Sequence, residues 1–462
     1  MCTAMRVFAV EYTLGDLYRI ALERSEKVKI FEEDVYIAER GKDKAMSALL
    51  PKVYGTGGYT RYTDTAMAST GSLIQPNEAT SYGARLEQAM SVGGREITSF
   101  KMSKEGVEKS KYDLYATKEG YIINVASGYF DVLRAKKLAE ISQAAVDRLT
   151  KHRNAAQTRL KVGEVTKTAV FRAEAELSGA QSDLIKSANL LKFRKAFLAR
   201  VVGIEGEYEV KDEESEDSKL KFDWKNPSSS IQYRESDFTL NGCRPLTAEC
   251  LKEIANNERA ELKSADLQKK IANDQITYAK GANWPTVTVE GTYSKRDESP
   301  PTSSLINENI YGGVRISFPF FEGGLRNAEI KEAMSKARQA DYAQSDLKKS
   351  IDIEVDGVYL DYITQRGVLK SLEDQYVFAN DNYNAVSKQF DFGLANSVDV
   401  MDANTLLVTA ERQLADSVYN YQLAILRLKR TTGTLLKTAF SDSTKGQGAK
   451  GSRDQGFKWP SD

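Results

Sequence analysis

The chain has 462 residues, of which 65 are Lys or Arg and 65 are Asp or Glu, so its formal net charge is zero. A neutral chain has no overall field that would attract nucleic acid. Its single His and three Cys offer few metal ligands, and the sequence contains neither a phosphate-binding glycine loop nor a nucleophile elbow. This composition argues against an enzyme, a metal or cofactor site and a nucleic-acid-binding protein.

No stretch reaches the roughly 18 apolar residues that a transmembrane helix requires, and the mean hydropathy is −0.47. Any passage through a membrane would therefore have to be made by strands. The first residues, MCTAMRVFAVEYTL, contain no complete export signal. Either that signal is missing or trimmed from this chain, or the protein is cytosolic, and this stretch alone does not decide between the two.

Two distant stretches, RLKVGEVTKTAVFRAEAEL and QFDFGLANSVDVMDANTLL, repeat one pattern. An offset of 230 positions places Gly163 on Gly393, and further upstream an offset of 234 places Pro51 on Pro285. We infer that one unit is used twice. The first repeat then covers residues 1–246 and the second 247–437, and the polar residues 438–462 are expected to be a disordered tail.

The sequence pattern of each repeat predicts its elements in the order helix, strand, strand, long helix, helix. The leading helical stretches, 12–49 and 247–282, end where a proline disfavours helix in the preceding residue. Strands are expected where apolar and polar side chains alternate with period two. These strands cover about 52–62, 82–92, 286–297 and 310–320.

Paired glycines at 93–94 and 323–324 separate the last strand of each repeat from a long helix. The long helices have about 67 residues, on the order of 100 Å at 1.5 Å per residue. Each is followed by a turn at Gly163 or Gly393 and by a returning helix. In the returning helices large and small residues alternate in a heptad, which favours an antiparallel coiled coil over an ordinary amphipathic core helix.

Four amphipathic strands in one chain cannot close a barrel, and open sheet edges are not tolerated in lipid. If these strands face a bilayer, several chains must pool them into a barrel that continues into a helical cylinder. The alternative is a soluble coiled-coil scaffold protein with small β caps. A requirement for detergent would separate the two interpretations.

The duplicated organisation, the strand-to-helix turns SVGGRE and FEGGLRNAE and the two repeated stretches together resemble the TolC family of outer membrane efflux proteins. The resemblance covers nearly the whole chain. It implies a mainly α fold with a small β part, which in a homotrimer forms a twelve-stranded outer membrane β-barrel continued by a periplasmic α-helical tunnel. It further implies a passive exit duct, serving a tripartite efflux pump or a type I secretion system, that contacts outer membrane lipid and docks a periplasmic adaptor and an inner membrane pump.

The resemblance also assigns roles to the two helix-to-helix turns, where family members meet the adaptor. The matching residues are Val162, Gly163 and Glu164 in the first turn and Phe392, Gly393 and Leu394 in the second. The two glycines also suit the reversal of the chain, and both roles can hold together.

Acidic rings line the entrance constriction in the family, and the matching residues here are Asp399 and Asp402. Their i, i+3 spacing places both carboxylates on one helical face, so a trimer would present two stacked rings. Alternatively, the two acids complement the dipole at the helix N-terminus that follows Asn396 and Ser397.

Family members can hold the entrance shut with a Tyr and an Arg that bond to a Thr–Asp pair. This chain has Phe390, Ala395, Thr168 and Ala169 at those positions, so only the threonine remains. We hypothesise that opposite charges form a replacement latch; solvated helix faces are the alternative. The latch would join Arg153, Arg159 and Lys161 to Asp381 and Asp391.

Residues 205–246 are acidic and loop-like, and they fit the equatorial region that girdles the tunnel in the family. Cys243 and Cys250 near its end are close enough in sequence to pair. Pairing would require an oxidising compartment, and two separate thiols are the alternative.

Overall fold

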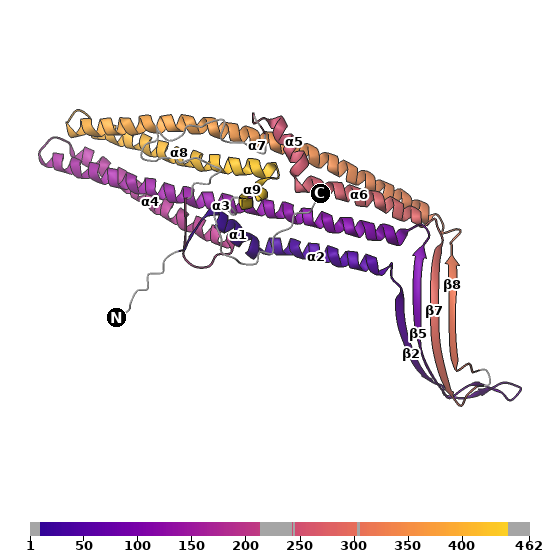
Figure 1. The fold of residues 1–462 in the computed structure, drawn as a ribbon. Coiled ribbons are helices and arrows are strands. Elements are labelled where there is room, and N and C mark those ends of the chain that lie inside the picture. The colour runs from indigo at the N-terminus through magenta and orange to yellow at the C-terminus, as the bar shows by residue number, and fades with distance from the viewer. Residues whose placement is uncertain (1–9, 213–242, 244, 303–304, 442–462) are drawn as a thin grey trace, which may run out of the picture. The chain divides into compact units, whose positions relative to one another are not determined.

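The computed structural model describes residues 10–212, 243, 245–302 and 305–441 (Figure 1). The start of the chain and most of the expected equatorial segment lie outside these residues. The chain divides into two compact units: unit 1 contains Met1–Ile30, Tyr115–Ala260 and Lys348–Asp462, and unit 2 contains Phe31–Leu114 and Glu261–Leu347. Among the described residues, no helix is long and apolar enough to cross a membrane.

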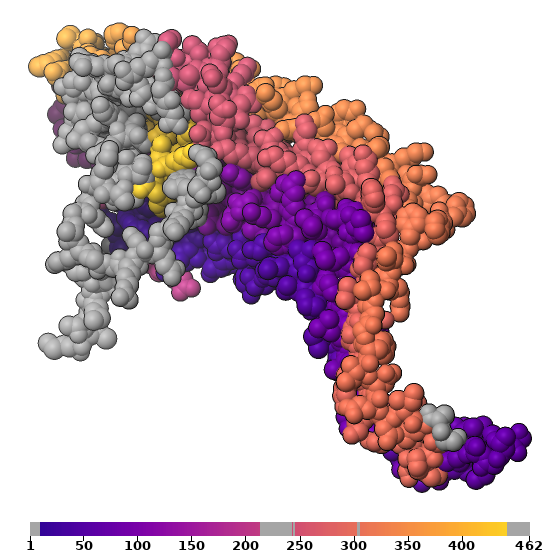
Figure 2. All heavy atoms as spheres, turned by 45° about the vertical axis from the view of Figure 1, so that its right-hand side comes forward, coloured from indigo at the N-terminus to yellow at the C-terminus, as the bar shows by residue number. Residues whose placement is uncertain are grey.

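The β part of unit 2 is a four-stranded antiparallel sheet. Its strands are β2 (Lys52–Arg61), β5 (Glu78–Ser91), β7 (Thr286–Ser299) and β8 (Glu308–Ser317), in the order β2-β5-β7-β8. Each repeat supplies one hairpin, and the hairpins join along β5 and β7. A small hairpin of β3 (Ala66–Met67) and β4 (Leu73–Gln75) follows β2 in the chain. In Figure 2 the sheet appears as a narrow column of atoms.

One face of this sheet is apolar and the other is polar. On the polar face, the guanidinium groups of Arg85 and Arg315 donate to the carboxylate of Glu290 at 2.8 and 3.3 Å. Arg85 also lies 3.4 Å from Glu87, which is paired across the strands with Glu290. Two like charges opposite each other are destabilising, so Arg85 offsets their repulsion. The apolar face is exposed in the single chain, with Val53, Val314 and Ile316 exposed by 71, 68 and 69 %.

The last strand ends earlier than the sequence predicted. We expected it to reach residue 320, but β8 ends at Ser317. Pro319 has no N–H to donate to a ladder, and Phe318 instead packs edge-on against Phe320, with ring centroids 5.0 Å apart. Conversely, β5 begins at Glu78, four residues before the expected start, because Glu78 finds a partner in Ser299.

The leading helix of each repeat is broken, contrary to the continuous helices that we predicted. α1 (Leu14–Arg24) and α2 (Glu26–Ser47) are separated by Ser25, and α5 (Ala248–Glu258) and α6 (Ala260–Gly281) by Arg259. Both separating residues are extended, with ψ of 120° and 123°, and both are buried. They lie 234 positions apart, so the break belongs to the duplicated unit.

The two long helices, α3 (Arg95–Lys161) and α7 (Leu325–Asp391), each have 67 residues. Each begins in unit 2 and ends in unit 1. The returning helices are α4 (Lys167–Val202) and α8 (Ser397–Thr431). A last helix, α9 (Leu435–Ser441), includes the first four residues of the expected tail; the rest of that tail lies outside the described residues.

The core of unit 1 joins helices from both repeats. Leu17 of α1, Ile122 of α3, Leu198 of α4 and Leu435 of α9 belong to one cluster, and each is at most 1 % exposed. A short parallel pair of β1 (Val10–Tyr12) and β6 (Tyr208–Val210) packs on this core through Tyr208 and Val210. This core anchors the part of α3 that leads to the first helix-to-helix turn.

The glycine pairs between sheet and helix serve different purposes in the two repeats. Gly323 and Gly324 both have positive φ, 62° and 91°, as does Gly94, with 69°. Gly93 is needed for space instead, because a Cβ there would lie 2.5 Å from the carbonyl oxygen of Gly281. Glycine permits both the left-handed conformation and the close approach.

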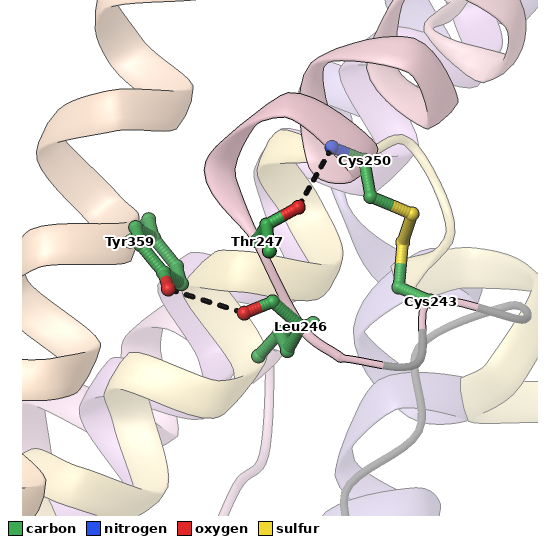
Figure 3. The surroundings of a disulfide bond; sticks show 5 residues. All are labelled: Cys243, Leu246, Thr247, Cys250 and Tyr359. Carbon is green, nitrogen blue, oxygen red and sulfur yellow. Dashed lines mark hydrogen bonds between the residues drawn. A yellow bond between two sulfur atoms is a disulfide. The ribbon is translucent and has the colours of Figure 1, made fainter.

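Cys243 and Cys250 are joined by a disulfide, with Cα atoms 6.0 Å apart (Figure 3). Two hydrogen bonds hold the same segment: Cys250 N donates to Thr247 Oγ1 at 3.3 Å, and the Tyr359 hydroxyl donates to the carbonyl oxygen of Leu246 at 3.1 Å. The start of α5 is thus fastened both to the preceding loop and to α7.

Candidate functional site: the two helical hairpin tips

The first hairpin, α3 and α4, turns at Gly163, which has φ of 84°. Glu164 N donates to the carbonyl oxygen of Arg159 at 2.9 Å, and Gly163 N donates to that of Leu160 at 3.1 Å. These bonds satisfy carbonyl groups that the end of the helix leaves unpaired, in the manner of a glycine C-cap. The turn does not bury Val162, which is 67 % exposed.

The second hairpin, α7 and α8, repeats this geometry. Gly393 has φ of 76°, and Leu394 N donates to the carbonyl oxygen of Gln389 at 2.8 Å. Phe392 and Leu394 are 80 and 79 % exposed. Both tips therefore present large apolar side chains to solvent on a backbone fixed by glycine, which is an arrangement suited to contact with another protein.

Asp399 takes part in the cap of α8. Its Oδ2 accepts from Asn396 N at 2.9 Å, while the Asn396 side chain accepts from Val398 N and Asp399 N at 2.8 and 3.1 Å. This capping box agrees with the structural role that we weighed for the pair. Asp399 and Asp402 are nevertheless both exposed, and Asp402 lies one turn further along the same face, so the cap leaves both charges available to solvent.

The five residues of the hypothesised charge latch make few mutual contacts within one chain. Arg159 does reach the second hairpin, but its Nη2 donates to the main-chain carbonyl oxygen of Asp391 at 2.7 Å rather than to a carboxylate. Among the ion pairs of the described residues, none joins Arg153 or Lys161 to Asp381 or Asp391. The charge latch stays a prediction.

Three side chains on one face of α3 connect it to the second hairpin; we call Arg148, His152 and Arg159 the α3 seam. Arg148 donates from Nη2 and Nη1 to the carboxylate of Glu411 at 3.0 and 3.3 Å, and from Nε to Asn404 Oδ1 at 2.9 Å. This bidentate pair is the strongest form of Arg–carboxylate contact.

His152 and Arg159 enclose the side chain of Phe390. The ring centroids of His152 and Phe390 are 4.7 Å apart, and the Arg159 guanidinium carbon lies 4.3 Å from the Phe390 centroid on a cation–π contact. His152 Nε2 and Ser397 Oγ form a buried hydrogen bond of 2.8 Å. Phe390 precedes the last residue of α7 and Ser397 is the first of α8, so the seam holds the turn at both ends.

The electrostatics at His152 favour the neutral imidazole. The pKa of His152 is lowered chiefly by burial and further by the positive charge of Arg159, whereas the carboxylate of Asp391 raises it. The imidazole is 6 % exposed. A proton on this ring would have to be accommodated with little water and beside another cation.

His152 is a site residue that we did not predict from the sequence. Two signals were present: it is the only His of the chain, and it lies four residues after Arg148 and seven before Arg159, on one helical face. Its partners Phe390 and Ser397 are more than 230 positions away, so the contact itself was beyond sequence patterns.

No group of three or more His, Cys, Asp or Glu side chains is placed to hold a metal ion within the part of the chain that the structure describes.

Comparison with known proteins agrees with this architecture. The outer membrane efflux protein family matches residues 17–203 and 251–434. The outer membrane protein TolC of Vibrio cholerae serotype O1 is 24 % identical over 438 residues, which cover 94 % of this chain and 93 % of that protein. The alkaline protease secretion protein AprF of Pseudomonas aeruginosa is 22 % identical, covering 93 % of this chain and 86 % of AprF.

Among solved structures, CusC superposes on this chain with a TM-score of 0.77 at 16 % identity, over 94 % of this chain and 95 % of that one. The predicted fold class, mainly α with a small β part built from two repeats, is thereby confirmed. The resemblance to the TolC family is confirmed as well, since the family match covers most of the sequence. The chain belongs to the outer membrane efflux protein family.

Proposed function

We propose that three copies of this chain form a passive exit duct in the outer membrane, with their sheets joined edge to edge into a twelve-stranded barrel and their long helices lining a periplasmic tunnel. The sheet of unit 2 carries this proposal. Its outer strands β2 and β8 have open edges in one chain, and its exposed aliphatic side chains share one face. Joining β8 of one copy to β2 of the next removes the edges and turns the apolar face to lipid.

The duct would serve a tripartite efflux pump or a type I secretion system. Membership of the efflux family supports the first, and the similarity to a protein named for protease secretion supports the second. We assign docking of a periplasmic adaptor to the exposed tip residues Val162, Phe392 and Leu394. The adaptor would connect the duct to an inner membrane pump.

We assign the entrance constriction to Asp399 and Asp402. Three copies would bring six carboxylates to one narrow passage, where they attract cations and repel one another. The capping bond of Asp399 uses one carboxylate oxygen, which leaves its negative charge in place. A charge latch from Arg153, Arg159 and Lys161 to Asp381 and Asp391 would be tested by charge reversal at Asp381 and Asp391; unchanged closed-state conductance would count against it.

Alternation along β8 offers a direct test of the proposed membrane sheet. Val314→Cys, Arg315→Cys and Ile316→Cys, each in a Cys2→Ser background, would be treated in native membranes with a membrane-impermeant maleimide. We expect Arg315→Cys to react and the two flanking variants to stay unlabelled until the protein is unfolded. Equal labelling of all three in membranes would favour a soluble coiled-coil scaffold instead.

A further inference from the structure

The turn of the second hairpin is attached to α3 at two points that lie on either side of Gly393. Before the glycine, Phe390 is enclosed by His152 and Arg159 and is only 3 % exposed. After it, the hydroxyl of Ser397 bonds to His152 Nε2 at 2.8 Å. One imidazole therefore contacts both helices of the hairpin that also carries Asp399.

We propose that His152 is a positioning residue that keeps the α7–α8 turn attached to α3, and that protonation of His152 releases this turn and opens the tunnel entrance. The inference rests on the proposed function, because an entrance exists only in the assembled duct.

The surroundings of His152 explain why a proton would weaken the attachment. On its own helix the cation that lowers the pKa of His152 is Arg159; α7 contributes the carboxylate of Asp391, and α8 contributes the uncharged hydroxyl of Ser397. The Arg159 guanidinium already donates to the Asp391 carbonyl oxygen and makes a cation–π contact with the Phe390 ring. An imidazolium would thus be buried beside a cation, an aromatic ring and a hydroxyl, and the carboxylate of Asp391 offsets only part of the cost of burying this charge.

The sign of the pH effect follows from comparing the attached and released states. Burial lowers the pKa of His152 in the attached state, whereas exposure to water would return it to its usual value of about 6.5. The released state therefore binds a proton more readily. The equilibrium constant for attachment is highest above about pH 6.5 and falls as the pH drops below it, by at most about tenfold per chain for each pH unit until the lowered pKa of the attached state is reached.

Because the chain has one His, its removal isolates this effect from other titrations. Channels would be recorded in planar bilayers between pH 7.5 and 5.5 for the wild type, His152→Gln and His152→Ala. Glutamine stays uncharged and can still bond to Ser397, whereas alanine loses both contacts. We expect the wild type to open several-fold more often at pH 5.5, His152→Gln to stay closed at both values and His152→Ala to be open at both.

A second measurement tests the attachment of the turn to α3 independently of whether the protein conducts. Hydrogen exchange of residues 388–396, corrected for intrinsic rates, should accelerate on acidification in the wild type and not in His152→Gln. The same pH dependence in both proteins, by exchange or conductance, would overturn the role of His152. Acid-dependent exchange that is lost in His152→Gln, with no conductance from any trimeric sample, would support the attachment and overturn the duct.

Discussion

Replacement of Arg148 by Met tests how strongly α3 is tied to the second hairpin. Methionine keeps a long apolar side chain but removes the guanidinium, which donates two hydrogen bonds to Glu411 and one to Asn404. The Arg148 and Glu411 side chains are 19 and 15 % exposed, and Asn404 is 5 % exposed. Water can therefore compensate little of what the substitution removes.

The structure sets the expected magnitude. Removing one member of a buried ion pair costs about 3–5 kcal/mol, and a hydrogen bond to a charged group contributes about 1.5–3 kcal/mol. Because the pair keeps some exposure, Arg148→Met should lower the free energy of unfolding by about 3 kcal/mol and Glu411→Gln by about 2 kcal/mol. The double variant should lose less than the sum, with a coupling energy of at least about 1.5 kcal/mol.

The assay is urea unfolding of the detergent-solubilised protein, followed by the helical circular dichroism signal. Lys336 and Glu332 form a matched control pair, 2.6 Å apart but 59 and 62 % exposed, for which little or no coupling is expected because water screens the two charges. If the coupling of Arg148 and Glu411 were no larger than that of the control, the α3 seam would not hold the hairpin as described.

Two further predictions concern junctions of the chain. Gly93→Ala should lower the melting temperature, because its Cβ would meet the main chain of Gly281. Gly41→Ala is the control and should leave the melting temperature unchanged, because the space around the new carbon is open. Equal effects of the two substitutions would contradict the requirement for close approach at Gly93. Reduction of the Cys243–Cys250 disulfide should lower the free energy of unfolding around α5 by about 2 kcal/mol. This loss should appear as faster hydrogen exchange in α5, measured with α4 as the internal reference. Unchanged exchange would contradict the prediction.

The long helices could be predicted because their signals are local. Glycines at 163 and 393 fix the helical reversals, and both adopt the positive φ that this role requires. The strand faces follow from alternation, and the polar face of β7 and β8 indeed carries Glu290 and Arg315. Because the unit is duplicated, each of these signals occurs twice. The weakly patterned strands of the first repeat could therefore be recognised by comparison with the clearer strands of the second.

The breaks at Ser25 and Arg259 had no such signal. Neither residue is Gly or Pro. Both are buried; the Ser25 hydroxyl caps α2 by accepting from Val28 N at 3.3 Å, whereas Arg259 makes a tertiary contact, donating to Glu354 at 2.5 Å. The attachment through His152 was missed for the same reason, since it joins residues of different repeats. Local patterns thus predicted the elements and the tips, whereas contacts between the hairpins required the structure.

The central claim is that the assembled chain conducts through an entrance lined by carboxylates. The most direct test is single-channel conductance of the wild type against Asp399→Asn/Asp402→Asn, in which the asparagines keep an oxygen for the α8 cap but remove the charge. Discrete, cation-selective openings whose selectivity and block by multivalent cations fall in the double variant are predicted. An absence of openings from properly trimeric wild-type protein would contradict the duct, and selectivity unchanged in the double variant would contradict the assigned constriction.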